Sequence, residues 1–193
     1  MTLLALFFLA FSIRQDSRDR EWSLRIRQGD TTAFNDFFDT YRDTLFSFLL
    51  SKGTPRDEAE DIIQQVFLTL WQNRSSIDPD KSLKSYVYRI AYNRMLNYFR
   101  DRKDTDPEYA YRLEDQTPGP HYQAEISEAL GTMQKTLEKM PHRRRTVFEL
   151  CYLEGFSYRE AAGILDISPK TIENHMIQAL KDLRKALRLH HPE

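Results

Sequence analysis

The residues with the clearest chemical pattern lie near the end of the chain, between residues 157 and 187. Two helix starts follow one another there at a spacing of about eleven residues. Ser157 and Glu160 have the spacing of a capping box. Ser168 and Pro169 are residue types typical of the N-cap and of the first position of a helix. A short helix, a tight turn and a longer helix form the layout that places its second helix in the major groove of DNA.

The second of these helices has an apolar face and a polar face. Its apolar stripe predicts a buried side formed by Ile172, Met176, Ala179, Leu180 and Leu183. The residues expected to contact DNA are Ser168, Lys170, Thr171, Glu173, Asn174, His175 and Gln178. Hydroxyl, amide and charged groups of this kind contact phosphates and base edges. A plain helical hairpin in an α-helical core would have the same periodicity, so the pattern favours DNA binding without excluding that alternative.

A second informative stretch combines positive charge with aromatic rings. Between Lys81 and Lys103 there are seven basic residues and one acid, Asp101. The aromatic residues between them are Tyr86, Tyr88, Tyr92, Tyr98 and Phe99. Basic groups bind phosphates, and aromatic faces stack on bases that have left the duplex. We therefore predict a helix over residues 82–103, capped by Ser82, that suits single-stranded or melting DNA. In the alternative interpretation its charges are merely solvated and its tyrosines are half-buried.

A third surface is the polar face of a helix predicted over residues 55–73. Thr54 is expected to cap this helix, with Pro55 at its first position. Its apolar stripe consists of Ala59, Ile62, Ile63, Val66, Phe67, Leu70 and Trp71. Asp61, Gln64 and Gln65 lie within one turn of one another on the opposite side. Such a face can hold a basic or polar partner helix, although many solvated faces have this composition.

These surfaces need a helical framework, and almost every patterned segment has a helical period. We predict an all-α protein with further helices over residues 31–50, near 123–139 and from Pro141. Three prolines, five acids and one base between residues 104 and 124 predict a flexible acidic linker. The expected organisation is an extension (1–20), a first helical domain (21–103), the linker (104–124) and a second helical domain (125–190).

The composition limits the chemistry. Lys and Arg total 28 and Asp and Glu total 29 in 193 residues, so net charge does not indicate a nucleic-acid partner. Cys151 is the only cysteine, which excludes an internal disulfide and a cysteine-based metal site. We interpret it as a buried structural thiol. No carboxylate cluster, zinc-ligand spacing or nucleophile–base pair stands out, so we predict no catalytic residue, metal or cofactor.

The first thirteen residues are nearly all apolar. They are too few to span a bilayer, which needs about 20, and they lack the charged start and cleavage site of a signal peptide. They are either a weak membrane anchor or an extension from a misplaced translation start. We favour the second interpretation, because everything after Asp16 is typical of a cytoplasmic protein.

Three motifs, in this order, resemble the bacterial RNA polymerase sigma factors of the sigma-70 family, in the extracytoplasmic-function (ECF) group. Residues 57–67 resemble region 2.2, and residues 82–93 resemble regions 2.3 and 2.4. Residues 156–162 with 168–172 resemble region 4.2. The resemblance covers about residues 25–188, and a chance helix-turn-helix would not bring the other two motifs.

The resemblance implies a non-enzymatic factor that directs promoter-specific initiation. Region 2.2 implies docking on the clamp helices of the largest polymerase subunit through Glu58, Asp61, Ile62, Gln64 and Gln65. Regions 2.3 and 2.4 imply melting and reading of the −10 element through Lys84, Tyr86, Tyr88, Arg89, Asn93 and Arg100. The loop from Arg74 to Lys81 and the start of the next helix would hold a flipped base. Region 4.2 implies reading of the −35 duplex by the helix-turn-helix residues.

The partners implied are core RNA polymerase (including its beta flap), promoter DNA and an anti-sigma factor, with no small-molecule substrate, in the cytoplasm. Three positions depart from the usual motifs: Gln65 replaces a common Glu, Tyr86 a common Trp, and Glu173 a common base. The run at residues 143–145 either adds phosphate contacts or forms a solvated corner.

Two rival functions remain open at this level. One is a duplex-binding regulator whose first domain senses a signal, which core-polymerase binding would distinguish. The other is a nuclease or recombinase, which metal-dependent cleavage would reveal.

Overall fold

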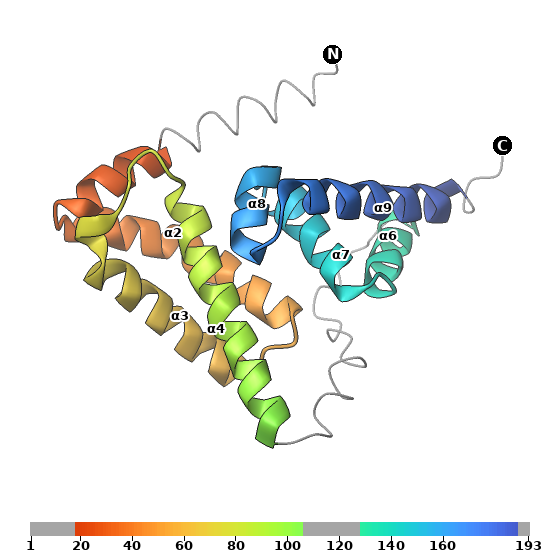
Figure 1. The fold of residues 1–193 in the computed structure, drawn as a ribbon, viewed down its shortest axis with the longest axis horizontal. Coiled ribbons are helices and arrows are strands. Elements are labelled where there is room, and N and C mark those ends of the chain that lie inside the picture. Colours follow the sequence, from red (N-terminus) through yellow and green to blue (C-terminus); the bar gives the residue numbers. More distant parts are fainter. Residues whose placement is uncertain (1–17, 106–127, 189–193) are drawn as a thin grey trace, which may run out of the picture. The chain divides into compact units, whose positions relative to one another are not determined.

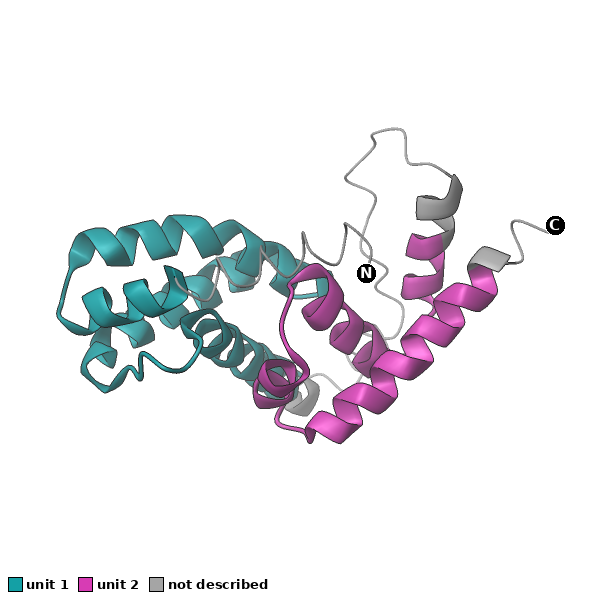
Figure 2. Cartoon of the chain, turned by 90° about the horizontal axis from the view of Figure 1, so that it is seen from above, with its two compact units in different colours: residues 1–116 teal, residues 117–193 magenta. Residues whose placement is uncertain are grey.

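The computed structural model describes residues 18–105 and 128–188. They belong to two compact units, which are treated separately below (Figure 2). The first unit contains a helical segment over residues 18–27, α2 (Thr31–Ser51), α3 (Arg56–Gln72), the 3₁₀ turn η1 (Arg74–Ser76) and α4 (Leu83–Thr105) (Figure 1). The second contains α6 (Glu128–Glu138), α7 (His142–Phe148), the π-helical segment η2 (Glu149–Leu153), α8 (Tyr158–Leu165) and α9 (Pro169–Arg188).

The first unit has a core rich in aromatic residues. Helices α2, α3 and α4 pack against one another, and the segment over residues 18–27 adds Trp22 and Ile26 to the core. The rings of Trp22, Phe37 and Tyr41 contact one another, with centroids 5.4 Å (Trp22–Phe37), 4.8 Å (Phe37–Tyr41) and 5.9 Å (Trp22–Tyr41) apart. These separations are typical of favourable edge-to-face and tilted ring pairs. The core therefore fixes the inner faces of all three long helices.

A buried carboxylate holds the N-terminus of α4. Asp19 accepts hydrogen bonds from the backbone N–H groups of Leu83 (2.7 Å) and Lys84 (3.2 Å). Its side chain satisfies donors that a helix start leaves without a partner, and its charge suits the positive end of the helix dipole. The Ser82 hydroxyl also accepts from the N–H of Ser85, as the sequence predicted. Two caps, one local and one distant, therefore fix where α4 begins.

Most predicted helices of the first unit are confirmed, with two corrections. α3 begins one residue later than expected, with Pro55 as its N-cap residue and no side-chain cap. The hydroxyl of Thr54, the predicted cap, is buried and has no hydrogen-bond partner. The segment over residues 18–27 was not predicted, and Asp19 belongs to the first unit although the expected extension reached residue 20.

In the second unit, α9 packs against α6, α7 and α8. The predicted helix-turn-helix is confirmed in detail. Ser157 and Glu160 form the reciprocal capping box of α8. Asp166 ends α8 in the left-handed conformation (φ 53°), which short polar side chains tolerate. Of the predicted apolar stripe of α9, Leu180 is half-buried, and the other members, Ile172, Met176, Ala179 and Leu183, are buried.

The expected linker and extension fall mainly outside the described residues. Residues 1–17 and 106–127 are not described, and α4 continues to Thr105, just past the expected start of the linker. The helix expected from residue 123 is described from Glu128 onward.

The Asp19 cap gives a stability prediction. Asp19→Ala leaves two N–H groups of α4 without their acceptor and should lower the free energy of unfolding of the first unit by about 1–3 kcal/mol. Asp19→Asn keeps one acceptor oxygen and should lose less. Urea unfolding followed by tryptophan fluorescence measures this unit alone, because Trp22 and Trp71 both lie in it. The exposed Asp36→Ala is the control, and an Asp19→Ala midpoint equal to that of the control would contradict the prediction.

Candidate nucleic-acid and polymerase interfaces

A cavity of about 260 Å³ lies where η1 and the following loop meet the first turns of α4. It is lined by Asn73, Ser76, Ile77, Asp78, Lys81, Ser82, Leu83, Tyr86 and Arg89. Asp78 accepts from the Asp80 N–H and pairs with Lys81 at 3.2 Å, which braces the loop. The same two contacts, the backbone bond first, lower the pKa of Asp78. The cavity thus lies at the loop from which the sequence predicted a base pocket, with an aromatic ring and hydrogen-bonding groups in its walls.

The outer face of α4 carries a row of predicted DNA contacts. Tyr86, Arg89, Asn93 and Arg100 are all exposed, and their spacing places them along one side of the helix. Tyr86 and Arg89 begin the row and also line the cavity. Leu96 is exposed in the same row but was not predicted. We call Tyr86, Arg89, Asn93, Leu96 and Arg100 the α4 outer row.

Two of the predicted −10 contacts lie on the opposite face. Tyr88 has no exposed surface, and its ring packs 5.3 Å from that of Phe48. Lys84 is half-buried, with its Nζ 5.8 Å from the Tyr41 ring and 5.6 Å from the Tyr88 ring. In this structure the prediction of a base contact is therefore wrong for Tyr88, which is a core residue. Lys84 belongs to the inner face and is not part of the outer row. Asn93 is exposed but does not line the cavity.

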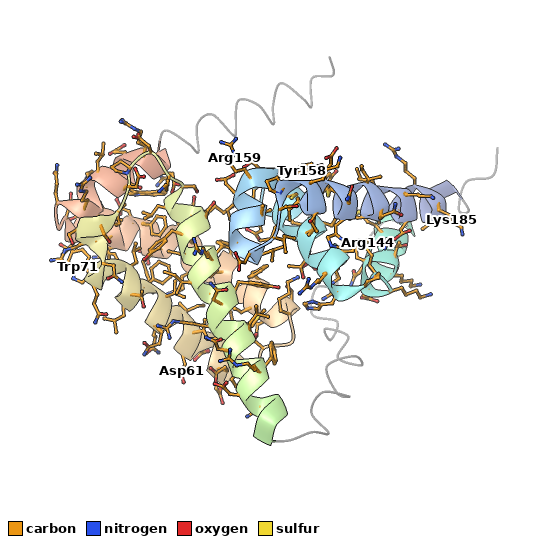
Figure 3. The ribbon with its side chains drawn as sticks, in the orientation of Figure 1. Asp61, Trp71, Arg144, Tyr158, Arg159 and Lys185 are labelled. Atoms are coloured by element: carbon orange, nitrogen blue, oxygen red, sulfur yellow. The ribbon has the colours of Figure 1, made fainter. Side chains whose placement is uncertain are left out.

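The predicted docking residues on α3 divide by exposure. Asp61, Gln64 and Gln65 are exposed within one turn, and Figure 3 labels Asp61 on this helix. Ile62 is only 4% exposed and belongs to the core, because it lies in the buried stripe of α3. Leu68, 47% exposed, extends the exposed row by one further turn and was not predicted. We call Asp61, Gln64, Gln65 and Leu68 the α3 outer face.

Two grooves flank the α3 outer face. Glu58, Asp61, Ile62 and Gln65 line one of about 390 Å³ between α3 and α4. Gln64 lines the other, of about 400 Å³, between α2 and α3. Burial, together with the neighbouring charge of Asp61, raises the pKa of Glu58. The exposed members of the predicted docking set, Asp61, Gln64 and Gln65, therefore form a ridge between two hollows.

The start of α9 is organised by its own polar side chains. The Ser168 hydroxyl accepts from the Thr171 N–H at 3.0 Å and lies 2.8 Å from the Thr171 hydroxyl. Lys170 and Glu173 form an ion pair at 2.7 Å. A DNA phosphate would compete for Lys170 and release the Glu173 carboxylate for another contact. Ser168 therefore caps α9, as predicted. A DNA contact by the same hydroxyl would have to be made while it also accepts the Thr171 N–H.

The remaining predicted contacts on α9 differ in exposure. Asn174 and Gln178 are exposed, whereas His175 is half-buried. Lys181, Arg184 and Lys185 extend the exposed face toward the C-terminal end, where Figure 3 labels Lys185. These cations were not predicted as contacts. They follow Ile177 by four, seven and eight residues, a spacing that places them on the same side of α9 as Ile177.

The arginine run at residues 143–145 is mostly engaged within the second unit. Arg144 pairs with Asp182 on α9, and Arg145 pairs with Glu149 at 3.1 Å. Burial lowers the pKa of Arg145. Arg143 is exposed. Two of the three arginines therefore form ion pairs within the unit, and Arg143 is the exposed member of the run.

Cys151 is half-buried instead of fully buried. Burial raises the pKa of its thiol to about 11, with a contribution from Glu160. The thiol is therefore protonated at neutral pH, which fits the structural interpretation.

Among the described residues, no group of three or more His, Cys, Asp or Glu side chains is placed to hold a metal ion. Within residues 18–105 and 128–188, every helix is too short or too polar to cross a membrane.

A basic, partly aromatic helix beside a cavity in one unit and a helix-turn-helix in the other are typical of a helical DNA-binding protein. Residues 37–105 match the family model for sigma-70 region 2, and residues 130–183 match that for sigma-70, region 4. The chain therefore belongs to the ECF group of the sigma-70 family, whose members direct promoter-specific transcription initiation by RNA polymerase and are not enzymes. The resemblance inferred from the three motifs is confirmed, and both rival functions are set aside.

Relatives align along nearly their whole length. The chain is 26% identical to RNA polymerase sigma factor CnrH of Cupriavidus metallidurans, over 89% of this chain and 95% of CnrH. It is 29% identical to ECF RNA polymerase sigma factor SigW of Bacillus subtilis, over 85% of this chain and 94% of SigW. The structure of CnrH in complex with the cytosolic domain of CnrY has a TM-score of 0.61 at 25% identity, covering 90% of this chain and 99% of CnrH. The structure of the sigma factor RpoE in complex with the anti-sigma factor NepR from Bartonella quintana has a TM-score of 0.62 at 22% identity. It covers 82% of this chain and 98% of RpoE.

The two tyrosines at the start of α4 provide a test of its inner and outer faces. Tyr88→Ala empties a fully buried site and should cost about 3–5 kcal/mol of unfolding free energy. Tyr86→Ala removes a ring that is 37% exposed at the edge of the cavity and should lower the unfolding free energy by clearly less, about 1 kcal/mol. Urea unfolding of both variants measures the difference. Equal destabilisation by the two variants would show that the faces are wrongly assigned.

Proposed function

We propose that the three surfaces divide the work of initiation between them. The α3 outer face docks on the clamp helices of the largest polymerase subunit. The α4 outer row and the cavity beside it melt and read the −10 element. The exposed face of α9 reads the −35 duplex. The observation that carries the proposal is the convergence of Tyr86 and Arg89, the first residues of the α4 outer row, on the cavity.

For docking, the α3 outer face offers a carboxylate, two amides and an apolar side chain within two turns. Asp61 can accept charge-assisted hydrogen bonds from a basic partner helix. Gln65 replaces the acid common at its position, and its amide can still donate and accept. Leu68 adds an exposed apolar side chain at the end of the ridge. Protein interfaces combine apolar area of this kind with polar contacts.

For melting, a base has to leave the duplex, which costs a few kcal/mol. Stacking on an aromatic ring returns about 1–3 kcal/mol per base. Tyr86 is exposed at the rim of the cavity, and Arg89 beside it can bind a phosphate or the base edge. Asn93, Leu96 and Arg100 would then guide the strand along α4, because they continue the same row.

For the −35 element, the capped start of α9 presents backbone N–H groups and the positive end of the helix dipole to a phosphate. Asn174 and Gln178 are exposed amides of the type that pairs with adenine in the major groove. Lys181 and Lys185 can bind phosphates along the same face, and Lys170 can do so by exchanging Glu173 for a phosphate.

The proposed partners are core RNA polymerase, including its beta flap, promoter DNA and an anti-sigma factor. The anti-sigma proposal is supported by the complexes of similarly folded proteins. The proposed location is the cytoplasm, where polymerase and chromosomal DNA are found.

Docking is tested by Asp61→Ala. Removing an exposed carboxylate that accepts charge-assisted bonds should weaken binding to core polymerase about tenfold. Equilibrium titration of labelled full-length chain with core enzyme measures the affinity. Asp36→Ala, another exposed acid of the first unit, should bind as the wild type does. Equal affinities of the Asp61 and Asp36 variants would refute this docking assignment.

Base capture is tested by Tyr86→Ala in the holoenzyme. Loss of one stacked base should reduce the open-complex equilibrium constant about five- to a hundredfold, whereas Tyr86→Phe should retain most of it. Permanganate footprinting of unpaired thymines reports melting, and closed-complex affinity is the control. Unchanged melting by the alanine variant would remove Tyr86 from the pocket.

A further inference from the structure

One apolar residue of α9 lies on the exposed face. Ile177 is 52% exposed, whereas Ile172, Met176 and Ala179 are buried against the rest of the unit. A single exposed aliphatic residue is ordinary on a protein surface. The position of Ile177 is what distinguishes it, because it lies in the middle of the face proposed to enter the major groove.

The residues around Ile177 are polar or basic. Lys170, Asn174, Ile177 and Lys181 follow one another at spacings of four, three and four residues, which places them in one row along α9. Gln178 is exposed beside the row. An apolar protein partner would have to bury these cations and amides at a cost. Binding in a DNA groove uses both kinds of side chain, because cations contact phosphates and amides contact base edges.

The major groove offers one apolar group, the C5-methyl of thymine. The β-branched side chain of isoleucine adopts one χ1 rotamer almost exclusively in a helix. Ile177 can therefore present its methyl groups with little loss of conformational entropy. Burial of one methyl group is worth about 0.8 kcal/mol, which corresponds to a three- to fivefold change in affinity. This effect is modest, and a single contact of this size can tune the preference for one base over another.

We propose that Ile177 is a specificity-determining residue that contacts the C5-methyl group of a thymine in the −35 duplex. The proposal rests on the proposed −35 function of α9 and adds the base that this position selects. Replacing that A·T pair by G·C would remove the methyl group together with the base-edge pattern, so a cleaner probe is needed to isolate the contact.

The test uses deoxyuridine, which lacks the methyl group and keeps the base pairing. Promoters are first mapped with the wild-type holoenzyme, and each thymine of the −35 element, on either strand, is then replaced singly. At fixed salt, one replacement should weaken binding of the wild-type holoenzyme about three- to fivefold. The same replacement should leave binding by the Ile177→Ala holoenzyme unchanged, and Ile177→Val should keep most of the sensitivity.

Leu153→Ala is the matched control, because Leu153 is an exposed aliphatic residue of the same unit that lies outside α9. It should keep the wild-type sensitivity to deoxyuridine. Equal sensitivity of the wild type and Ile177→Ala at every thymine, or a −35 element without A·T pairs, would overturn the proposal and leave the proposed function standing. A wild-type holoenzyme that selects no promoter would overturn both.

Discussion

The first unit depends on the contact that fixes the start of α4. Asp19 binds two backbone N–H groups there, although it precedes them by 64 and 65 residues in the chain. The carboxylate is nearly buried, so the contact is shielded from water and its loss would leave helix donors without partners. Because the same turns of α4 form a wall of the cavity, this contact also sets the position of Tyr86 and Arg89.

The core then decides which way α4 faces. Val87, Tyr88 and Ala91 have no exposed surface. A helix held on that side must present residues offset by about half a turn to solvent, and these include Tyr86 and Asn93. Two tyrosines separated by one residue therefore have opposite roles, one in the packing of the unit and one at the rim of the cavity.

The parts that could be predicted from sequence are those with local causes. The two helix starts of the helix-turn-helix were recognised because a cap and its partner lie within three residues of each other. The burial of Tyr88 was not predicted, because tyrosines occur on both sides of α4 and Tyr86 and Tyr88 were assigned the same role. The role of Asp19 was also hidden, since its partners lie on a helix far along the chain. The exposure of Ile177 could not be predicted from its type, since it follows Met176 of the buried stripe and aliphatic residues at such positions are often buried.

Lys170, at the start of α9, pairs with Glu173, and Arg144 pairs with Asp182 further along the same helix, so two cations of the second unit are already engaged with acids. Phosphate contacts supply most of the affinity of DNA-binding proteins. A unit in which some cations are already paired can still read a sequence when a second site holds it at high local concentration. Docking on polymerase would supply that tether, so readout by α9 and docking by α3 are expected to depend on each other.

The most direct test of this account is transcription from genomic DNA of the source organism by core polymerase reconstituted with the full-length chain, with every start site mapped. The account predicts a defined set of start sites, absent with core enzyme alone and preceded by shared −10 and −35 sequences at a constant spacing. Start sites that match those of core enzyme alone, or that share no upstream sequence, would contradict it.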